Sequence, residues 1–165
     1  METKKDAGRE GFTLALALVD AVPVLCFGVS AILIGLLFKS PLFIFGAACV
    51  FLGGASKVLW KILLAVKKID VPLLTKLFRI LMFGGFAVVV LSVILGIRRI
   101  VFAKLAAEVL SMPSVVFFAL GLCGMVTMGV LAKKLDSSKA KSNWIEQCVN
   151  GCAQLCILIG ILFLF

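Results

Sequence analysis

The residues of this chain that could do chemistry are a few ionisable side chains that interrupt long apolar segments. Asp20, Lys57 and Lys61 each lie among aliphatic and aromatic residues, and Glu146 lies near the start of the last such segment. A charge in the hydrocarbon of a bilayer is costly, so such residues usually pair with one another, face a cavity or serve a function. We therefore treat them as candidates for a functional site.

Three neutral polar residues, Gln147, Asn150 and Gln154, accompany these charges in the last apolar segment. Their spacings of three and four place them on one face of a helix, and that face reaches towards the middle of the membrane. Such amides can hydrogen-bond to a neighbouring helix, or they can line a cavity that holds water or a polar solute. Both interpretations stay open. The candidate intramembrane polar site comprises Asp20, Lys57, Gln147, Asn150 and Gln154.

The second apolar segment carries a stripe of small residues that leads to its lysines. Spacings of three and four place five residues on this stripe: Gly46, Cys49, Gly53, Lys57 and Lys61. The three small residues predict close packing against another helix. Side chains lean towards the helix N-terminus, so Lys57 leans towards the bilayer centre if this helix runs inwards. Asp20 is the only carboxylate at comparable depth, which favours an Asp20–Lys57 pair. The alternatives are that Lys57 snorkels to lipid headgroups and that Asp20 caps its own helix.

Other polar and aromatic residues are expected at the inner membrane surface. Trp60 and Trp144 lie near the ends of apolar segments, where indole rings prefer to sit. Lys61 comes about 20 residues into its segment, which is the length of a membrane span, so we predict it to be an interface residue. Asn143 and Glu146 have the spacing of a capping box, which predicts that Glu146 caps the last helix.

Several kinds of chemistry lack the residues that they need. The chain has no histidine and no tyrosine, which removes histidine-based triads and histidine-ligated zinc or haem. All six cysteines lie in apolar segments, so no disulfide framework is indicated. Cys148, Cys152 and Cys156 are stacked on one helix face rather than convergent, and we expect them to act as small apolar residues. We predict no metal, no cofactor and no catalytic residue.

Five apolar segments must position these residues. The chain has 165 residues, of which 63% are hydrophobic, and the excess falls in blocks as long as the roughly 20 residues of a membrane span. An amphipathic stretch at 98–111 is predicted to lie on the membrane surface. The fold class is therefore all-α, a single polytopic membrane helical bundle over 1–165. Its five transmembrane helices are predicted at about 12–38, 42–66, 73–97, 113–132 and 144–165.

The basic residues predict the orientation of the bundle. The formal net charge is +9, and most basic residues lie in short loops or near the ends of apolar segments. If the N-terminus is cytoplasmic, most of these loop charges fall on the cytoplasmic side, as the positive-inside rule requires. We predict a multi-pass protein of a plasma or bacterial inner membrane with an external C-terminus. Its basic loops would contact anionic headgroups rather than nucleic acid.

Three functions are compatible with these features. The first is a transporter or channel-like protein with a cytoplasm-facing polar cavity for a small anionic or polar solute. Five helices are few for a complete pathway, so a homodimer would be expected. The second is a non-catalytic accessory, assembly or lipid- and partner-binding membrane subunit. The third is a membrane-embedded lipid-modifying enzyme, which is disfavoured because no catalytic motif is present.

Overall fold

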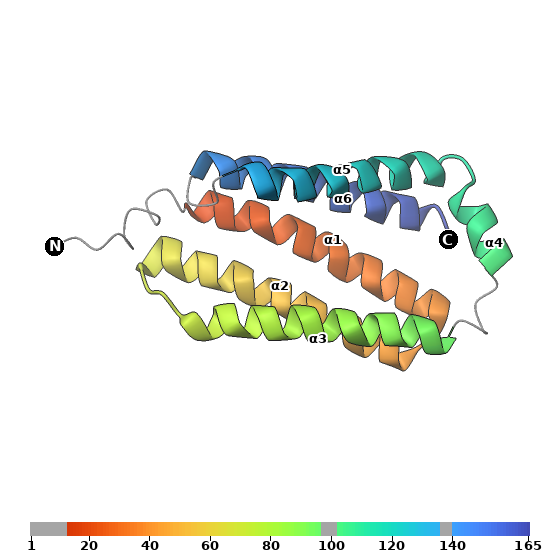
Figure 1. Ribbon diagram of the computed structural model, residues 1–165, viewed down its shortest axis with the longest axis horizontal. Coiled ribbons are helices and arrows are strands. Elements are labelled where there is room, and N and C mark those ends of the chain that lie inside the picture. The colour runs from red at the N-terminus through yellow and green to blue at the C-terminus, as the bar shows by residue number, and fades with distance from the viewer. Residues whose placement is uncertain (1–12, 97–101, 136–139) are drawn as a thin grey trace.

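The computed structural model describes residues 13–96, 102–135 and 140–165, and within these ranges it consists of helices and short connections (Figure 1). Five of the helices are long and apolar enough to cross a membrane, and one is short. The predictions of a helical bundle and of five membrane-length helices are confirmed. A short helix lies within the amphipathic stretch 98–111, whose place on the membrane surface stays a prediction. The helices are α1 (Leu14–Phe38), α2 (Pro41–Lys67), α3 (Pro72–Gly96), α4 (Phe102–Val109), α5 (Ser114–Lys134) and α6 (Ala140–Leu162).

The ends of the first two helices follow from local capping. The Thr13 hydroxyl accepts a hydrogen bond from the backbone N–H of Leu16, and the Ser40 hydroxyl accepts one from Phe43. Each hydroxyl satisfies a backbone donor that has no partner within its own helix. Lys39 and Lys68 end α1 and α2 in the left-handed conformation, with φ of 48° and 55°. The chain can therefore reverse direction within a few residues at both ends of α2.

The five membrane-length helices form a row, and each packs mainly on the helices next to it in that row. The order across the row is α3, α2, α1, α6 and α5, so α2 lies between α1 and α3. Figure 1 shows that α1 and α6 both run from the left of the view to the right and are therefore parallel. The start of α1 and the end of α6 lie at opposite ends of the bundle. An odd number of membrane-length helices gives this arrangement.

The backbones of α2 and α3 lie in close contact. A Cβ atom added at Gly46 would lie 2.9 Å from the carbonyl oxygen of Gly85, and one added at Gly85 would lie 2.7 Å from that of Gly46. At Gly53 an added Cβ would approach the Cβ of Leu81 to 3.2 Å. Small residues allow this close approach of two backbones. Gly46 and Gly53 of the sequence-predicted stripe therefore face α3, with Cys49 half-buried between them.

Small residues on α6 allow it to pack on two helices at once. Ala153 is 2% exposed, and it contacts α5 so closely that a Cβ atom at Gly124 would lie 2.6 Å from its own Cβ. Gly151 is buried and lies beside Val22 of α1. α6 thus joins α5 to the remainder of the row and brings its polar residues towards α1.

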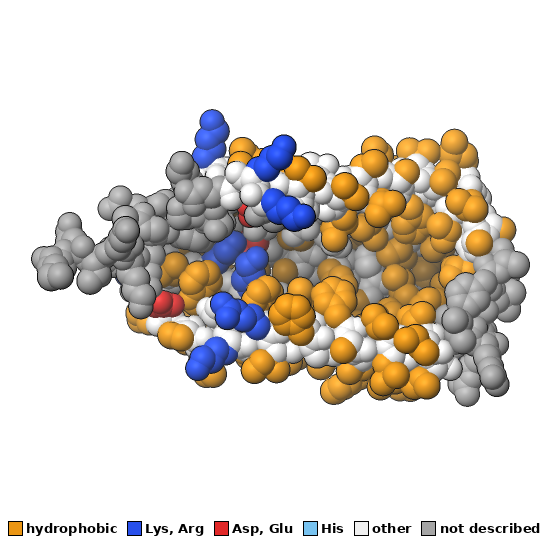
Figure 2. Space-filling model, viewed as in Figure 1, with side chains coloured by type: hydrophobic (Ala, Val, Ile, Leu, Met, Phe, Trp, Pro, Cys, Tyr) orange, Lys and Arg blue, Asp and Glu red, His pale blue; other side chains and the backbone are white. Residues whose placement is uncertain are grey.

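Large apolar side chains cover much of the outer surface, as a lipid environment requires. Figure 2 shows a hollow that runs between α5 and α3, with hydrophobic side chains along most of its length. Lys and Arg side chains gather around the end of the hollow where α1 begins. The molecule is therefore polar at one end and apolar along its sides.

Candidate functional site

A buried ion pair joins α1 to α2. The ammonium Nζ of Lys61 lies 2.9 Å from Oδ2 of Asp20, and the two side chains are 4% and 5% exposed. Both residues lie within membrane-length helices. A charge in such a place is tolerated when an opposite charge compensates it, and each of these residues supplies the compensation for the other.

The partner of Asp20 is therefore Lys61 and not Lys57, which corrects the sequence-based expectation of an Asp20–Lys57 pair. Gly54 of α2 packs against Val24 of α1. Asp20 lies one helical turn before Val24, and Lys61 lies two turns after Gly54, so the antiparallel helices bring the two charges together. Lys61 is 3% exposed and faces α1. Its side chain is therefore directed between two helices and not towards lipid headgroups, whereas its predicted depth at the membrane interface stays a prediction.

Lys57 faces the side of α2 that meets α3. Its ammonium lies 5.4 Å from the centroid of the Phe78 ring of α3, a cation–π contact, and its side chain is half-buried. The neighbouring Ser56 hydroxyl donates to the carbonyl oxygen of Gly53 at 2.7 Å and lies 3.4 Å from that of Leu74. Among the residues that the structure describes, Lys57 takes part in no ion pair.

The three amide side chains of α6 have different surroundings. Gln147 is 5% exposed, and its amide oxygen has no hydrogen-bond partner within the described part of the chain. It lies one turn before Gly151, on the face that meets α1. Asn150 is half-buried. Gln154 points to α5, where its Nε2 lies 3.7 Å from the sulfur of Met125. Of the three amides, Gln147 is thus the buried one, on the face that meets α1.

Glu146 has a different role from the predicted cap. The described part of α6 already begins at Ala140, so Asn143 lies inside the helix and is buried there. The capping box is therefore absent, and that prediction is wrong. Glu146 is half-buried, and its negative charge acts on the ammonium group of Lys61. The positive charge of Lys57 acts on the same ammonium group.

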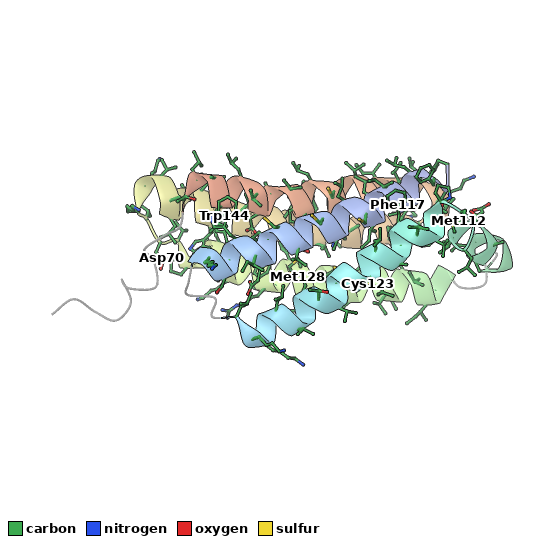
Figure 3. The ribbon with its side chains drawn as sticks, turned by 90° about the horizontal axis from the view of Figure 1, so that it is seen from above. Asp70, Met112, Phe117, Cys123, Met128 and Trp144 are labelled. Carbon is green, nitrogen blue, oxygen red and sulfur yellow. The ribbon has the colours of Figure 1, made fainter. Side chains whose placement is uncertain are left out.

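The two tryptophans lie at the end of the bundle that carries the basic residues. The indole Nε1 of Trp60 donates to Oδ1 of Asp70 at 2.9 Å and so ties α2 to the connection before α3. Figure 3 shows Trp144 and Asp70 towards one end, whereas Phe117 and Met112 lie towards the other. This position is the one that the sequence predicts for indoles, at the end of an apolar helix.

The site therefore combines charges from α1, α2 and α6. Asp20 pairs with the Lys61 ammonium, Glu146 adds a longer-range negative charge, and Lys57 adds a second ammonium next to Phe78. The sequence pointed to the two lysines, Asp20 and Gln147. It contained no signal for Phe78, whose role depends only on how α3 packs against α2.

No protein-family model, curated protein or solved structure matches this chain. In the described residues no group of three histidine, cysteine or acidic side chains is placed to hold a metal ion. What the site does must be inferred from the geometry of its own side chains.

Proposed function

We propose that the chain is a transporter or channel-like membrane protein that binds a small anionic or polar solute at Lys57 from the cytoplasmic side. The observation that carries this proposal is that Lys57 has no described counter-ion in its apolar surroundings. Its ammonium lies within a membrane-length helix, over the ring of Phe78 at 5.4 Å, and no described carboxylate pairs with it. A cation in such surroundings gains most from an anion that can enter and leave.

The other charges of the site support this assignment. Asp20 and Lys61 neutralise each other at 2.9 Å, so neither is readily available to a solute. Their pair fixes α1 against α2 and holds the turn of α2 that carries Lys57. The buried amide of Gln147, whose oxygen lacks a described partner, adds a group that could accept a hydrogen bond from a polar solute.

The shape of the molecule supports access from one end. The hollow between α5 and α3 has Lys and Arg side chains around one end (Figure 2), and a positive rim concentrates anions at that end. With the N-terminus in the cytoplasm, that end faces the cytoplasm, in agreement with the positive-inside rule. The hollow is open along one side, so we propose that a second copy of the chain completes the pathway.

A second candidate is a non-catalytic subunit that binds a partner helix or lipid. Gly84 of α3 and Gly129 of α5 favour it, because a Cβ atom added at either would meet nothing within 4 Å. Glycines on an outer face allow a further helix to approach closely. A protein of this kind would use its charges for packing and would move no solute.

Flux in liposomes distinguishes the two candidates. The full-length protein is reconstituted, and the flux of chloride, phosphate and succinate is measured for the wild type, Lys57→Met, Lys57→Arg and Lys76→Met. Lys76 is an exposed lysine near the start of α3 and serves as the matched control. We expect flux of at least one anion and a decrease of about tenfold or more in Lys57→Met, because a charge-assisted contact of about 1.5–3 kcal/mol is lost.

Lys57→Arg should keep most of the flux, because it keeps the charge, and Lys76→Met should lower the flux much less than Lys57→Met, because it removes only one of several charges at the rim. Equal flux in the wild type and Lys57→Met would remove Lys57 from the mechanism. No flux of any of the three anions, together with a stoichiometric partner that co-purifies from native membranes, would favour the second candidate.

A further inference from the structure

An apolar groove runs between α1 and α2 on the outer surface of the bundle. Its volume is about 320 Å³, and it is lined by apolar residues of these two helices. On the α1 side it extends from Leu25 to Ile32, whose side chains are 60% and 63% exposed, so the groove opens outwards. Because both helices have the length of a membrane span, the groove faces hydrocarbon when the protein is in a bilayer.

Small residues form the floor of this groove. Ala31 of α1 and Ala47 of α2 line it and are buried in one apolar cluster, so the two helices touch beneath it. A Cβ atom added at Gly28 would lie 2.8 Å from the Phe51 ring. Packed helices lie about 8–10 Å apart, whereas a helix with its side chains is about 10–12 Å wide. A third helix therefore cannot sink between α1 and α2, and the groove suits a single chain.

The chemistry of the lining selects the kind of chain. No side chain that lines the groove carries a polar group, so a polar solute there would lose its hydrogen bonds to water without replacement. An empty groove would leave its walls without contact atoms and would forfeit their dispersion attraction. The occupant that fits is therefore a hydrocarbon chain.

A cation lies beyond one end of the groove. The backbone N–H of Lys39 donates to the carbonyl oxygen of Gly35, and a Cβ atom added at Gly35 would lie 2.8 Å from Ile44, which lines the groove. Lys39 is exposed, and among the described residues it takes part in no ion pair. Along α1, Ile32 lies roughly 10 Å from Lys39 and Leu25 roughly 21 Å. Since half of the hydrocarbon core is about 15 Å thick, the groove spans the depths that an acyl chain reaches when its headgroup lies at Lys39.

We propose that the groove binds one acyl chain of a phospholipid whose phosphate is held by Lys39. The ammonium donates a charge-assisted hydrogen bond to the phosphate, and the walls of the groove contact the chain. Lys39 lies 19 residues after Asp20, or roughly 28 Å along α1, so this lipid belongs to the leaflet opposite the Lys57 site. It is a resident partner of the bundle and is independent of any solute that binds at Lys57.

A photoactivatable lipid tests the site. The purified full-length protein in a non-ionic detergent is mixed with a small amount of phosphatidylcholine that carries a diazirine in the second half of one acyl chain. After irradiation, mass spectrometry measures the labelling of residues 25–32 relative to the exposed apolar residues of α3. Diacylglycerol with the same diazirine chain, which has no phosphate, is tested in parallel.

Two variants and two matched controls complete the experiment. Ala48→Phe fills the groove from an exposed position of its lining, and Lys39→Gln removes the cation. Ala87→Phe is the control for size, because Ala87 is an exposed alanine of α3 at a similar depth, two residues from the contact of α3 with Gly46. Lys68→Gln is the control for charge, because Lys68 ends α2 in the same left-handed conformation as Lys39 but at the opposite end of the helix.

We expect the phospholipid to label residues 25–32 several-fold more than the exposed residues of α3. Lys39→Gln should lower this labelling about tenfold, the ratio expected when one charge-assisted hydrogen bond is lost, and diacylglycerol should label the wild type as weakly. Ala48→Phe should lower the labelling to the level of α3, whereas Ala87→Phe and Lys68→Gln should behave as the wild type.

Three results would overturn the proposal. The first is labelling spread evenly over the exposed apolar faces of the helices. The second is an equal effect of Lys39→Gln and Lys68→Gln, or equal labelling by diacylglycerol and the phospholipid. The third is a dimer in native mass spectrometry that Ala48→Phe dissociates, which would assign the groove to a second copy of the chain.

Discussion

At the scale of single residues, the buried charges of α1 and α2 are divided between two roles. Lys61 is bound to Asp20 at 2.9 Å and stabilises the contact between the two helices, whereas Lys57 lies over Phe78 without a described counter-ion. The two lysines are one helical turn apart and differ mainly in which neighbour they face. Their roles therefore differ because Lys61 faces α1 and Lys57 faces α3.

This division leads to a double-mutant prediction. Asp20→Asn or Lys61→Met alone should lower the free energy of unfolding by about 3–5 kcal/mol, because each leaves one buried charge without its partner. The double variant should recover much of this loss. Unfolding of the purified proteins in mixed micelles measures all four free energies.

Lys57→Met is the matched control for this cycle. It removes a cation–π contact worth about 0.5–2 kcal/mol and leaves no carboxylate unpaired, so its unfolding free energy should change much less. Single variants at Asp20 and Lys61 that are as stable as the wild type would show that the pair contributes nothing. Additive losses in the double variant would show that the two residues do not interact.

The sequence predicted which residues of the site are unusual, but it did not predict which of them meet. Asp20, Lys57 and Gln147 are conspicuous because charges and amides are rare in apolar segments. Their pairing depends on the rotation of α2, with Gly53 towards α3 and Gly54 towards α1. Adjacent glycines give no sequence signal for which neighbour each one faces, so the sequence alone favoured the wrong lysine.

At the scale of helices, the packing of α2 against α3 positions Phe78 beneath Lys57. Gly46 and Gly85 are in backbone contact, and a Cβ atom at Gly85 would lie 2.7 Å from the Gly46 oxygen and 2.8 Å from the Val50 nitrogen. Neither backbone atom can move without shifting its helix. The close separation of α2 and α3 therefore depends on the absence of a Cβ atom at these glycines.

We accordingly expect Gly85→Ala to lower the free energy of unfolding by about 1–3 kcal/mol, the usual range for overpacking. Gly84→Ala is the matched control, because its added Cβ would meet nothing within 4 Å and alanine favours helix over glycine by about 1 kcal/mol. Thermal unfolding followed by tryptophan fluorescence measures both. Equal effects of the two substitutions would mean that α2 and α3 are not in close contact.

The helices themselves were largely predictable, with one instructive exception. Long apolar segments, the capping hydroxyl of Ser40 and Pro41 after it locate α1, α2 and α3 to within a few residues. The start of α6 was misplaced because Lys141, Ser142 and Asn143 are polar and look like a loop. Ser142 and Asn143 are in fact buried, so tertiary contacts extend the helix beyond the apolar pattern.

At the scale of the whole molecule, the five membrane-length helices place the start of α1 and the end of α6 at opposite ends. The basic residues gather at the first of these ends (Figure 2). If the positive-inside rule applies, this end is cytoplasmic and the end of α6 is external. The cluster of Asp20, Lys57 and Lys61 then lies in the inner half of the membrane.

Reporter fusions test this orientation. In a bacterial host we expect alkaline phosphatase fused after Phe165 to be active and the same enzyme fused at the Lys67–Lys68 connection to be inactive, because phosphatase folds only outside the cytoplasm. Fluorescent-protein fusions at the same two sites are the control and should give the opposite pattern. Phosphatase activity at the connection but not at the C-terminus would invert the orientation and place Lys57 in the outer half.

The central claim is that anions reach Lys57 from the cytoplasmic side, and the accessibility of this position tests it most directly. Lys57→Cys is made in a background whose six native cysteines are replaced, and its reaction with a negatively charged methanethiosulfonate is timed in vesicles of either orientation. Leu59→Cys, on an exposed apolar face of α2, is the control. We predict rapid modification of position 57 from the cytoplasmic side only, and none at position 59. A cysteine at position 57 that reacts from neither side, or only from the external side, would contradict the claim.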